Sequence, residues 1–228
     1  MYDIVFISYH EPNAEENFND LFERFNKVTM FGDRIKRVKN VKGIHNAHVE
    51  AAKLVNTSYF FVVDGDAKIV DDFDFDYVTD EEDVVHVYRS MNPINDLVYG
   101  YGGVKLFPTR LSRNMDTKTS DMTTSISKKF KALPQISNIT EFNTDPFSTW
   151  KSAFRECAKL SSKVIDRQKT GETDERLKTW TTVGHDRLYG EYALAGAMAG
   201  MEFGLSRRSD LGLINNFEWL KEQFDGNT

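Results

Sequence analysis

The sequence contains one cysteine, Cys157, in 228 residues. A single cysteine cannot form an internal disulfide or build a thiolate metal site by itself, which fits a reducing compartment. No apolar run approaches the roughly 20 residues that are needed to span a bilayer. The first residues, MYDIVFISYHE, also lack the basic start and small-residue cleavage site of a signal peptide. We therefore expect a cytoplasmic protein without a membrane partner.

The composition is that of an ordinary globular protein, with 40% hydrophobic and 28% charged residues. The length suits one sizeable α/β domain, and a single domain over residues 1–228 is expected. The net charge is −6, but residues 64–83 carry ten acids and one lysine, so that the rest of the chain has a net charge of +3. Two stretches, 34–42 and 105–131, are locally basic. The overall acidity therefore does not exclude a phosphate-rich partner.

Short apolar strands alternate with amphipathic helices in the first half of the chain. This pattern predicts a mainly parallel sheet with helices on both faces, the Rossmann-like α/β class. The expected strands are Asp3–Ile7, a short one within Ile35–Val41, Tyr59–Val63, Asp83–Tyr88 and 98–107. Two helices separate the first three strands, one with Asn13 as its cap and Glu16 reaching back to it, the other carrying Ile44, Ala47, Ala51 and Leu54 on one face.

The second half is less regular in its pattern. Residues 109–146 are polar and predict a long loop with one short helix near Thr123–Phe130. Three further helices are expected: Phe147–Val164, one that begins after Gly184 and runs through the small residues of GEYALAGAMAG, and Leu213–Phe224.

Two aspartates follow the apolar strand YFFVV at its end, as Asp64-Gly65-Asp66. Ligands of open α/β sheets bind beyond the carboxyl ends of the strands. The glycine lets the backbone bend so that both carboxylates can face one ligand. Hard cations such as Mg²⁺ and Mn²⁺ take one or two carboxylates together with phosphate oxygens. The pair therefore predicts a holder for a metal diphosphate, although an acidic surface turn would show the same letters.

The stretch VKGIHNAHVEAAKLVNTSYFFVVDGDA, residues 41–67, resembles GT-A-type, family-2-like glycosyltransferases. The first strand, DIVFISYHEPN, and the glycine-containing YGYGGVKLF extend this resemblance. Together with FNTDPFSTWKSAFREC, these stretches are similar to glycosyltransferases of tailed bacteriophages, some of which modify hydroxymethylated pyrimidines in phage DNA. The resemblance implies a GT-A fold, with a nucleotide-sugar-binding half at 1–108 and a helical and loop acceptor-binding half at 109–228. For a phage protein, the expected compartment is the host cytoplasm.

The resemblance also implies roles for individual residues. Asp66 and Asp64 would bind Mn²⁺ or Mg²⁺, and Asp64 could instead contact the ribose. The expected donor-binding residues are Ser8, Tyr9, Glu11, His45, Asn46 and Asp64.

The catalytic base remains open between two acids. In TVGHDRLYGEY, either Asp186 is the base or His185 is a third metal ligand, because inverting relatives carry a Glu-Asp pair where this chain has His-Asp. Asp145 is the second candidate, although an aspartate before proline also suits a helix cap.

The expected acceptor-binding residues are Arg110, Arg113, Lys128, Lys129 and Trp150. The arginines and lysines would guide a phosphate backbone, and the tryptophan ring would stack on a nucleobase or sugar. The predicted function is hexosyl or pentosyl transfer from a nucleotide sugar, with a UDP-sugar expected, to a hydroxyl acceptor such as 5-hydroxymethylcytosine in phage DNA. Two alternatives remain: a sugar-1-phosphate nucleotidyltransferase, for which no Gly-rich phosphate loop follows the first strand, and a non-catalytic GT-A-like carbohydrate-binding or virion module.

Overall fold

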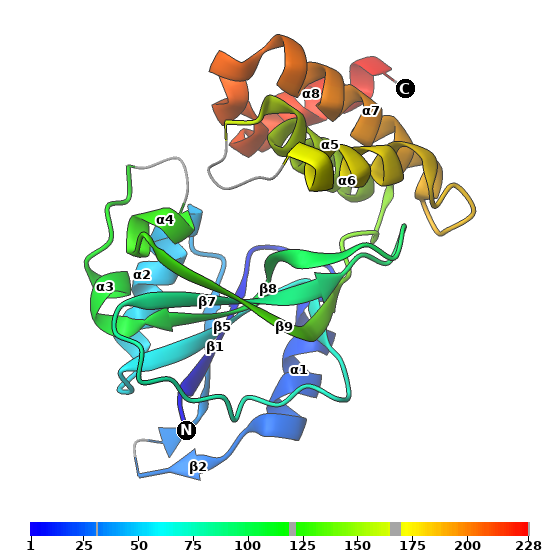
Figure 1. Cartoon of the computed structure of the whole chain (residues 1–228). Coiled ribbons are helices and arrows are strands. Elements are labelled where there is room, and N and C mark those ends of the chain that lie inside the picture. Colours follow the sequence, from blue (N-terminus) through cyan, green and yellow to red (C-terminus); the bar gives the residue numbers. More distant parts are fainter. Residues whose placement is uncertain (31, 119–121, 165–169, 228) are drawn as a thin grey trace. The chain divides into compact units, whose positions relative to one another are not determined.

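The computed structural model of this chain describes residues 1–30, 32–118, 122–164 and 170–227 (Figure 1). The chain forms two compact units. Unit 1 consists of Met1–Met91 and Val98–Glu141, and unit 2 consists of Asn92–Leu97 and Phe142–Thr228. The expected division at residues 108 and 109 falls inside unit 1.

Unit 1 is built on a seven-stranded sheet. Its strands, in spatial order, are β4 (Ile35–Lys39), β1 (Asp3–Ser8), β5 (Tyr59–Asp64), β8 (Val98–Pro108), β7 (Val84–Met91), β9 (Lys129–Thr140) and β6 (Ala67–Ile69). Strands β4, β1, β5, β7 and β9 run in one direction, whereas β8 and β6 run in the other. The predicted α/β class with a mainly parallel sheet is therefore confirmed. A separate small hairpin pairs β2 (Val28–Thr29) with β3 (Gly32–Asp33).

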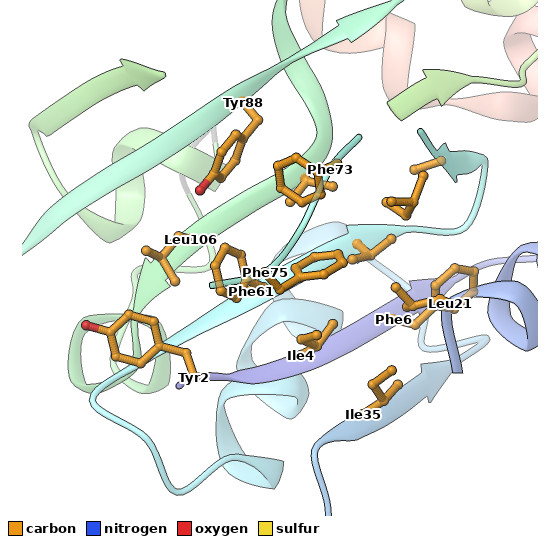
Figure 2. Packing of buried hydrophobic residues seen from close by; sticks show 14 of the residues in the cluster. Tyr2, Ile4, Phe6, Leu21, Ile35, Phe61, Phe73, Phe75, Tyr88 and Leu106 are labelled. Atoms are coloured by element: carbon orange, nitrogen blue, oxygen red, sulfur yellow. The ribbon is translucent and has the colours of Figure 1, made fainter. Parts of the chain in front are cut away.

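Both faces of this sheet are buried, and a different helix packs on each. Helix α1 (Ala14–Phe25) packs on the face that carries Ile4 and Phe6, while α2 (Ile44–Leu54) packs on the face of Val5. Figure 2 shows the α1 face, where the rings of Phe61 and Phe75 lie edge to face with centroids 5.1 Å apart. Because both faces are covered, the first five residues of β5, YFFVV, are buried and apolar, as the sequence indicated.

The prediction of a long loop over residues 109–146 was wrong for most of this range. The structure has α3 (Thr109–Arg113), α4 (Met122–Ile126) and the 12-residue strand β9 there, while 119–121 lie outside the described residues. Strand β9 lies parallel to β7, and its buried positions include the polar Ser137 and Asn138. Polar residues at buried positions removed the alternation that would have predicted a strand.

Unit 2 is helical. It consists of α5 (Pro146–Ser162), α6 (Thr170–Thr182), α7 (Gly190–Ser206), the 3-10 helix η1 (Arg208–Asn215) and α8 (Phe217–Asn227). Glycines bring α7 close to α5, as the small residues predicted: a Cβ added at Gly200 would lie 2.2 Å from the Phe154 carbonyl oxygen. The tight α5–α7 contact excludes larger side chains at this position.

Several expected helix boundaries were wrong. Helix α6 was missed, and the last expected helix, Leu213–Phe224, is divided between η1 and α8. Helix α7 does begin after Gly184 and runs through GEYALAGAMAG, as expected, although residues 185–189 form a turn before its first residue, Gly190. Asn13 does precede α1, but its side chain donates to Glu141 instead of capping the helix. Among the described residues, no helix combines the length and apolar character needed to cross a membrane.

Candidate functional site

The predicted carboxylate pair lies at the carboxyl end of β5, next to the carboxyl end of β1. The two strands are parallel neighbours with Ile7 opposite Asp64, so that the turns following them adjoin. Gly65 contacts the β1 turn directly: an added Cβ would lie 2.6 Å from Glu11 Oε2 and 3.0 Å from Ser8 Cβ. The structure therefore brings Ser8, Glu11, Asp64 and the following Asp66 together, and Gly65 leaves the space for this approach.

Glu11 is held in this cluster by its own turn. Its Oε2 atom accepts a hydrogen bond of 2.6 Å from the backbone N–H of Tyr9. His10 lies in the left-handed region at φ 64° and its N–H donates to Asn40 Oδ1 at 3.1 Å, which fixes the turn to the end of β4. Tyr9 itself is exposed, so that one face of its ring is available to a ligand.

Asp64 is paired with a cation from the neighbouring strand. Its Oδ2 atom accepts hydrogen bonds from Lys105 Nζ at 3.0 Å and from the Gly103 N–H at 3.1 Å. Burial acts to raise the pKa of Asp64, but the Lys105 charge, followed by the His48 ring and these hydrogen bonds, holds it below its usual value. Asp64 is therefore ionised at neutral pH.

Asp66 has the opposite electrostatic surroundings. Burial, then the negative charges of Asp64 and Glu11, raise its pKa to about 7. Its backbone carbonyl accepts from the Glu141 N–H at 2.7 Å, which anchors this position to the end of β9. The surroundings thus drive the pKa values of two aspartates two residues apart in opposite directions, so that Asp64 is ionised at neutral pH while ionisation of Asp66 is opposed.

The raised pKa of Asp66 bears on whether a divalent cation fits at this site. Within the described ranges, no three or more His, Cys, Asp or Glu side chains are grouped to hold a metal. One or two carboxylates with phosphate oxygens from a substrate are nevertheless the usual ligands of Mg²⁺. Asp66 and the Asp64 oxygen that does not bind Lys105 match that requirement, and a cation there would relieve the repulsion that raises the pKa of Asp66. The residues present fit a metal that binds with a diphosphate.

Two residues that sequence reasoning missed contribute to this site. Lys105 interrupts an apolar strand, and a lone charge in such a strand was the signal that could have identified it. His48 lies on α2 with its Nδ1 atom 2.8 Å from the Ile44 carbonyl oxygen, and its Nε2 atom is buried with no hydrogen-bond partner in the described part of the chain. Burial, above all, lowers the pKa of His48 to about 4, so that the ring is neutral.

The predicted His45 and Asn46 begin the same helix but face outward to different degrees. His45 is half-buried and Asn46 is exposed. The Asn46 amide donates to the Lys42 carbonyl oxygen at 3.2 Å, a bond that stabilises the turn before α2. Their donor-binding role stays a prediction.

The basic residues predicted to bind the acceptor are paired within unit 1. Arg110 forms an ion pair with Asp83 at 2.9 Å, and Lys129 Nζ donates to the Glu82 carbonyl oxygen at 3.2 Å. Arg113 donates to the carbonyl oxygens of Ala52 and Val55, at 2.9 and 2.7 Å, and so satisfies the end of α2. Lys128 also has an interaction partner. These pairings reduce the free positive charge of the segment.

The remaining predicted residues belong to unit 2, whereas Asp64 and Asp66 belong to unit 1. Asp145 caps α5, because its Oδ1 accepts from the Ser148 N–H at 2.8 Å. Trp150 is only 2% exposed and stacks on Phe154 in the unit 2 core, which leaves no ring face open for an acceptor.

His185 and Asp186 lie in the turn between α6 and α7, where both are exposed. The turn is fixed by Gly184, since a Cβ there would lie 2.3 Å from the Ile94 carbonyl oxygen, and by the Arg187–Asp96 ion pair at 2.9 Å. An exposed carboxylate and imidazole on a fixed turn are accessible to a ligand, so both stay candidates for base or metal ligand.

Comparison with known proteins gives distant similarities. No protein-family model matches the sequence, and no curated protein matches it. Among solved structures, TarS 1-349 of S. aureus is 12% identical, with 100% of this chain and 92% of that chain covered at a TM-score of 0.41.

A mannosyltransferase of Pyrobaculum calidifontis, in complex with GDP-Man and Mn²⁺, is also 12% identical, over 97% of this chain and 84% of that chain, at a TM-score of 0.41. HddC of Yersinia pseudotuberculosis is 15% identical over 59% of this chain and 69% of that chain, at a TM-score of 0.36. Identity and TM-score are low for each of these three structures.

Proposed function

We propose that this protein is a glycosyltransferase that moves a sugar from a nucleotide-sugar donor to a hydroxyl acceptor. The observation that carries the proposal is the cluster of Glu11, Asp64 and Asp66 at the carboxyl ends of β1 and β5, where burial, and then the charges of Asp64 and Glu11, raise the pKa of Asp66 to about 7. The surrounding sequence resembles GT-A glycosyltransferases, and this resemblance implies that the cluster binds a metal and the diphosphate of a nucleotide sugar. Mn²⁺ or Mg²⁺ is the proposed cofactor, held by Asp66 and Asp64.

The donor is proposed to bind at the β1 turn. The exposed Tyr9 is proposed to stack on the base, and Ser8 and Glu11, which lie against Gly65 between the two aspartates, are proposed to contact the rest of the donor. Asp66 and Asp64 would hold a divalent cation that, when bound, would offset the negative charge developing on the leaving diphosphate. The C1–oxygen bond of the donor breaks, a new bond forms between C1 and the acceptor oxygen, and the nucleoside diphosphate leaves.

The acceptor hydroxyl loses a proton in this transfer. In an inverting reaction a carboxylate accepts it. Asp186 is the preferred candidate because it is exposed and sits in a turn that Gly184 and Arg187 fix. Asp145 is the weaker candidate, because its carboxylate already serves as the cap of α5.

The finer identity of the substrates is proposed from the resemblance to phage enzymes. It favours a UDP-sugar that donates a hexose or a pentose, and 5-hydroxymethylcytosine in phage DNA as the acceptor. A modified base in duplex DNA would have to be flipped out to reach the site. Because Arg110 and Lys129 are already paired, we expect DNA binding to compete with these internal contacts.

Donor hydrolysis and transfer test the proposal. A panel of nucleotide sugars is incubated with the protein and Mn²⁺, with and without DNA that contains 5-hydroxymethylcytosine, and the products are separated by mass. We expect one donor to be hydrolysed slowly alone and consumed faster with the acceptor. Absence of turnover together with absence of metal-dependent nucleotide binding would refute the enzymatic function.

The role of the aspartates is tested with a matched pair of variants. Asp66→Ala should abolish transfer, while Asp72→Ala, at an exposed position of the same acidic segment, should keep it. Full activity of the Asp66→Ala protein would contradict the proposed metal site. Charge reversal at Lys128 and Lys129 tests whether this segment binds a DNA acceptor. If it does, sugar transfer to DNA falls while donor hydrolysis is retained.

A further inference from the structure

Lys105 occupies an unusual position for a lysine. It lies in the middle of the sheet on β8, opposite Val62 of β5 and Val87 of β7, and is only 8% exposed. Those neighbours and Phe107, two residues further on, belong to the apolar core beneath α2. Burial of an ammonium group in such surroundings is costly unless the charge is paired. The lysine therefore needs a partner.

The partner is one carboxylate of the proposed donor site. Lys105 Nζ lies 3.0 Å from Asp64 Oδ2, with the two side chains 11% and 33% exposed. The nearby His48 ring carries no charge at neutral pH, since burial lowers its pKa to about 4. The ammonium also acts on Asp66, where its charge opposes the rise in pKa. Lys105 is thus a positive charge that is paired with Asp64 and also acts on Asp66.

Resting on the proposed function, we propose that Lys105 is a resident counter-cation of the donor site that makes the divalent cation and the donor diphosphate bind together rather than separately. Two physical effects lead to this. The ammonium occupies an Asp64 oxygen and repels an incoming cation, which weakens binding of the metal alone. A diphosphate attracts the same ammonium and competes with Asp64 for it, so that its arrival releases the Asp64 oxygen for the metal. Lys105 is a positioning residue for Asp64 and sets this coupling.

The test uses Mn²⁺ alone and inorganic pyrophosphate as probes. Binding of Mn²⁺ is measured by the loss of the free-ion electron spin resonance signal, for the wild type and for Lys105→Met, Lys105→Arg and Lys36→Met. Lys105→Met should bind Mn²⁺ alone about tenfold more tightly, because removing a charge a few ångströms away is worth on the order of a factor of ten. Lys105→Arg keeps the charge and should behave like the wild type.

Lys36 provides a matched control within unit 1. Its Nζ lies 2.9 Å from Asp3 Oδ1, with side chains 17% and 9% exposed, so that it is a comparably buried ion pair. Its carboxylate partner, Asp3, is the first residue of β1, whereas Asp64 lies opposite Ile7, near the last residue of that strand. Lys36→Met should therefore leave Mn²⁺ binding unchanged. An equal gain in both methionine variants would point to a general charge effect and overturn the proposal.

The coupling itself is the second readout. With correction for the complex that the two probes form in solution, Mn²⁺ and pyrophosphate should each strengthen the binding of the other by the same factor in the wild type, as linkage requires. That factor should shrink in Lys105→Met. Independent binding of the two probes to the wild-type protein overturns the proposal even if the methionine variant does not fold.

The outcomes distinguish this inference from the proposed function. If the wild type binds no Mn²⁺ with or without pyrophosphate, both the proposed metal site and the inference fail. If it binds Mn²⁺ and hydrolyses a donor, while Lys105→Met binds the ion with unchanged affinity, the inference alone fails.

Discussion

Replacement of Asp66 by asparagine should stabilise the metal-free protein, and the gain should grow as the pH rises. The pKa of Asp66 is raised from 3.8 to about 7, chiefly by burial and then by Asp64 and Glu11. A raised carboxyl pKa means that folding opposes the charged form. Below pH 3.8 Asp66 is protonated in both the folded and the unfolded state, so it does not affect the free energy of unfolding. Between pH 3.8 and 7 the unfolded chain has released this proton while the folded protein retains it, so the free energy of unfolding falls as the pH rises.

The magnitude follows from the size of the shift. Three pKa units correspond to roughly 4 kcal/mol above pH 7, since each unit is worth about 1.4 kcal/mol. Allowing for partial access of water to the side chain, we expect Asp66→Asn to raise the free energy of unfolding by about 2–4 kcal/mol at pH 8 and by about 1–2 kcal/mol at pH 5. Urea unfolding at both pH values, with a chelator present, measures this.

The neighbouring aspartate supplies the control. Asp64→Asn should destabilise the protein, because it leaves the buried Lys105 ammonium without its carboxylate partner at 3.0 Å. Opposite signs for two substitutions two residues apart would be hard to explain by a general effect of removing charge. A gain at Asp66 that is equal at pH 5 and pH 8, or a loss of stability at pH 8, would refute the electrostatic reasoning.

Two further predictions concern unit 2. Gly200→Ala should lower the free energy of unfolding by about 1–3 kcal/mol, because the added methyl would lie 2.2 Å from the Phe154 carbonyl oxygen and force α5 and α7 apart. Thermal or urea unfolding measures this change. Gly212→Ala, with open space at its Cβ position, should be nearly neutral in the same assay. Asp145→Ala should cost about 1 kcal/mol through the loss of its hydrogen bond to the Ser148 N–H, and a fall of more than about a hundredfold in kcat measured at a temperature where the variant is folded would instead make it the catalytic base.

The local pattern of the sequence was enough for the first half of unit 1. Strands β1, β4 and β5 and helix α2 lie within a residue or two of their predicted bounds, because apolar runs and helical spacing depend on each segment alone. The position of the carboxylate pair at the end of β5 followed in the same way. The resemblance implied that Ser8 and Glu11 bind the donor, whereas their closeness to the pair became known only when the structure showed β1 and β5 as parallel neighbours.

The elements that depend on distant partners were not predictable. Strand β9 has polar residues at Ser137 and Asn138 that tertiary structure alone buries, and its partner β7 begins about 45 residues earlier. Gly103 on β8 shows such a distant contact. Its φ is +73°, and a Cβ added there would collide with the Asn138 side chain of β9, so the two strands approach closely at this point. A pattern search along the chain contains no information on such contacts.

The sequence by itself therefore determined which residues could form a metal diphosphate site, whereas only the tertiary structure decided their charge states. Asp64 and Asp66 are the same residue type two positions apart, and no local rule separates them. Lys105, about 40 residues later in the chain, pairs with one of them, while Glu11, more than 50 residues earlier, repels the other. Electrostatic interactions act through space, so the different pKa values of the two aspartates appear only when β1, β5 and β8 lie side by side.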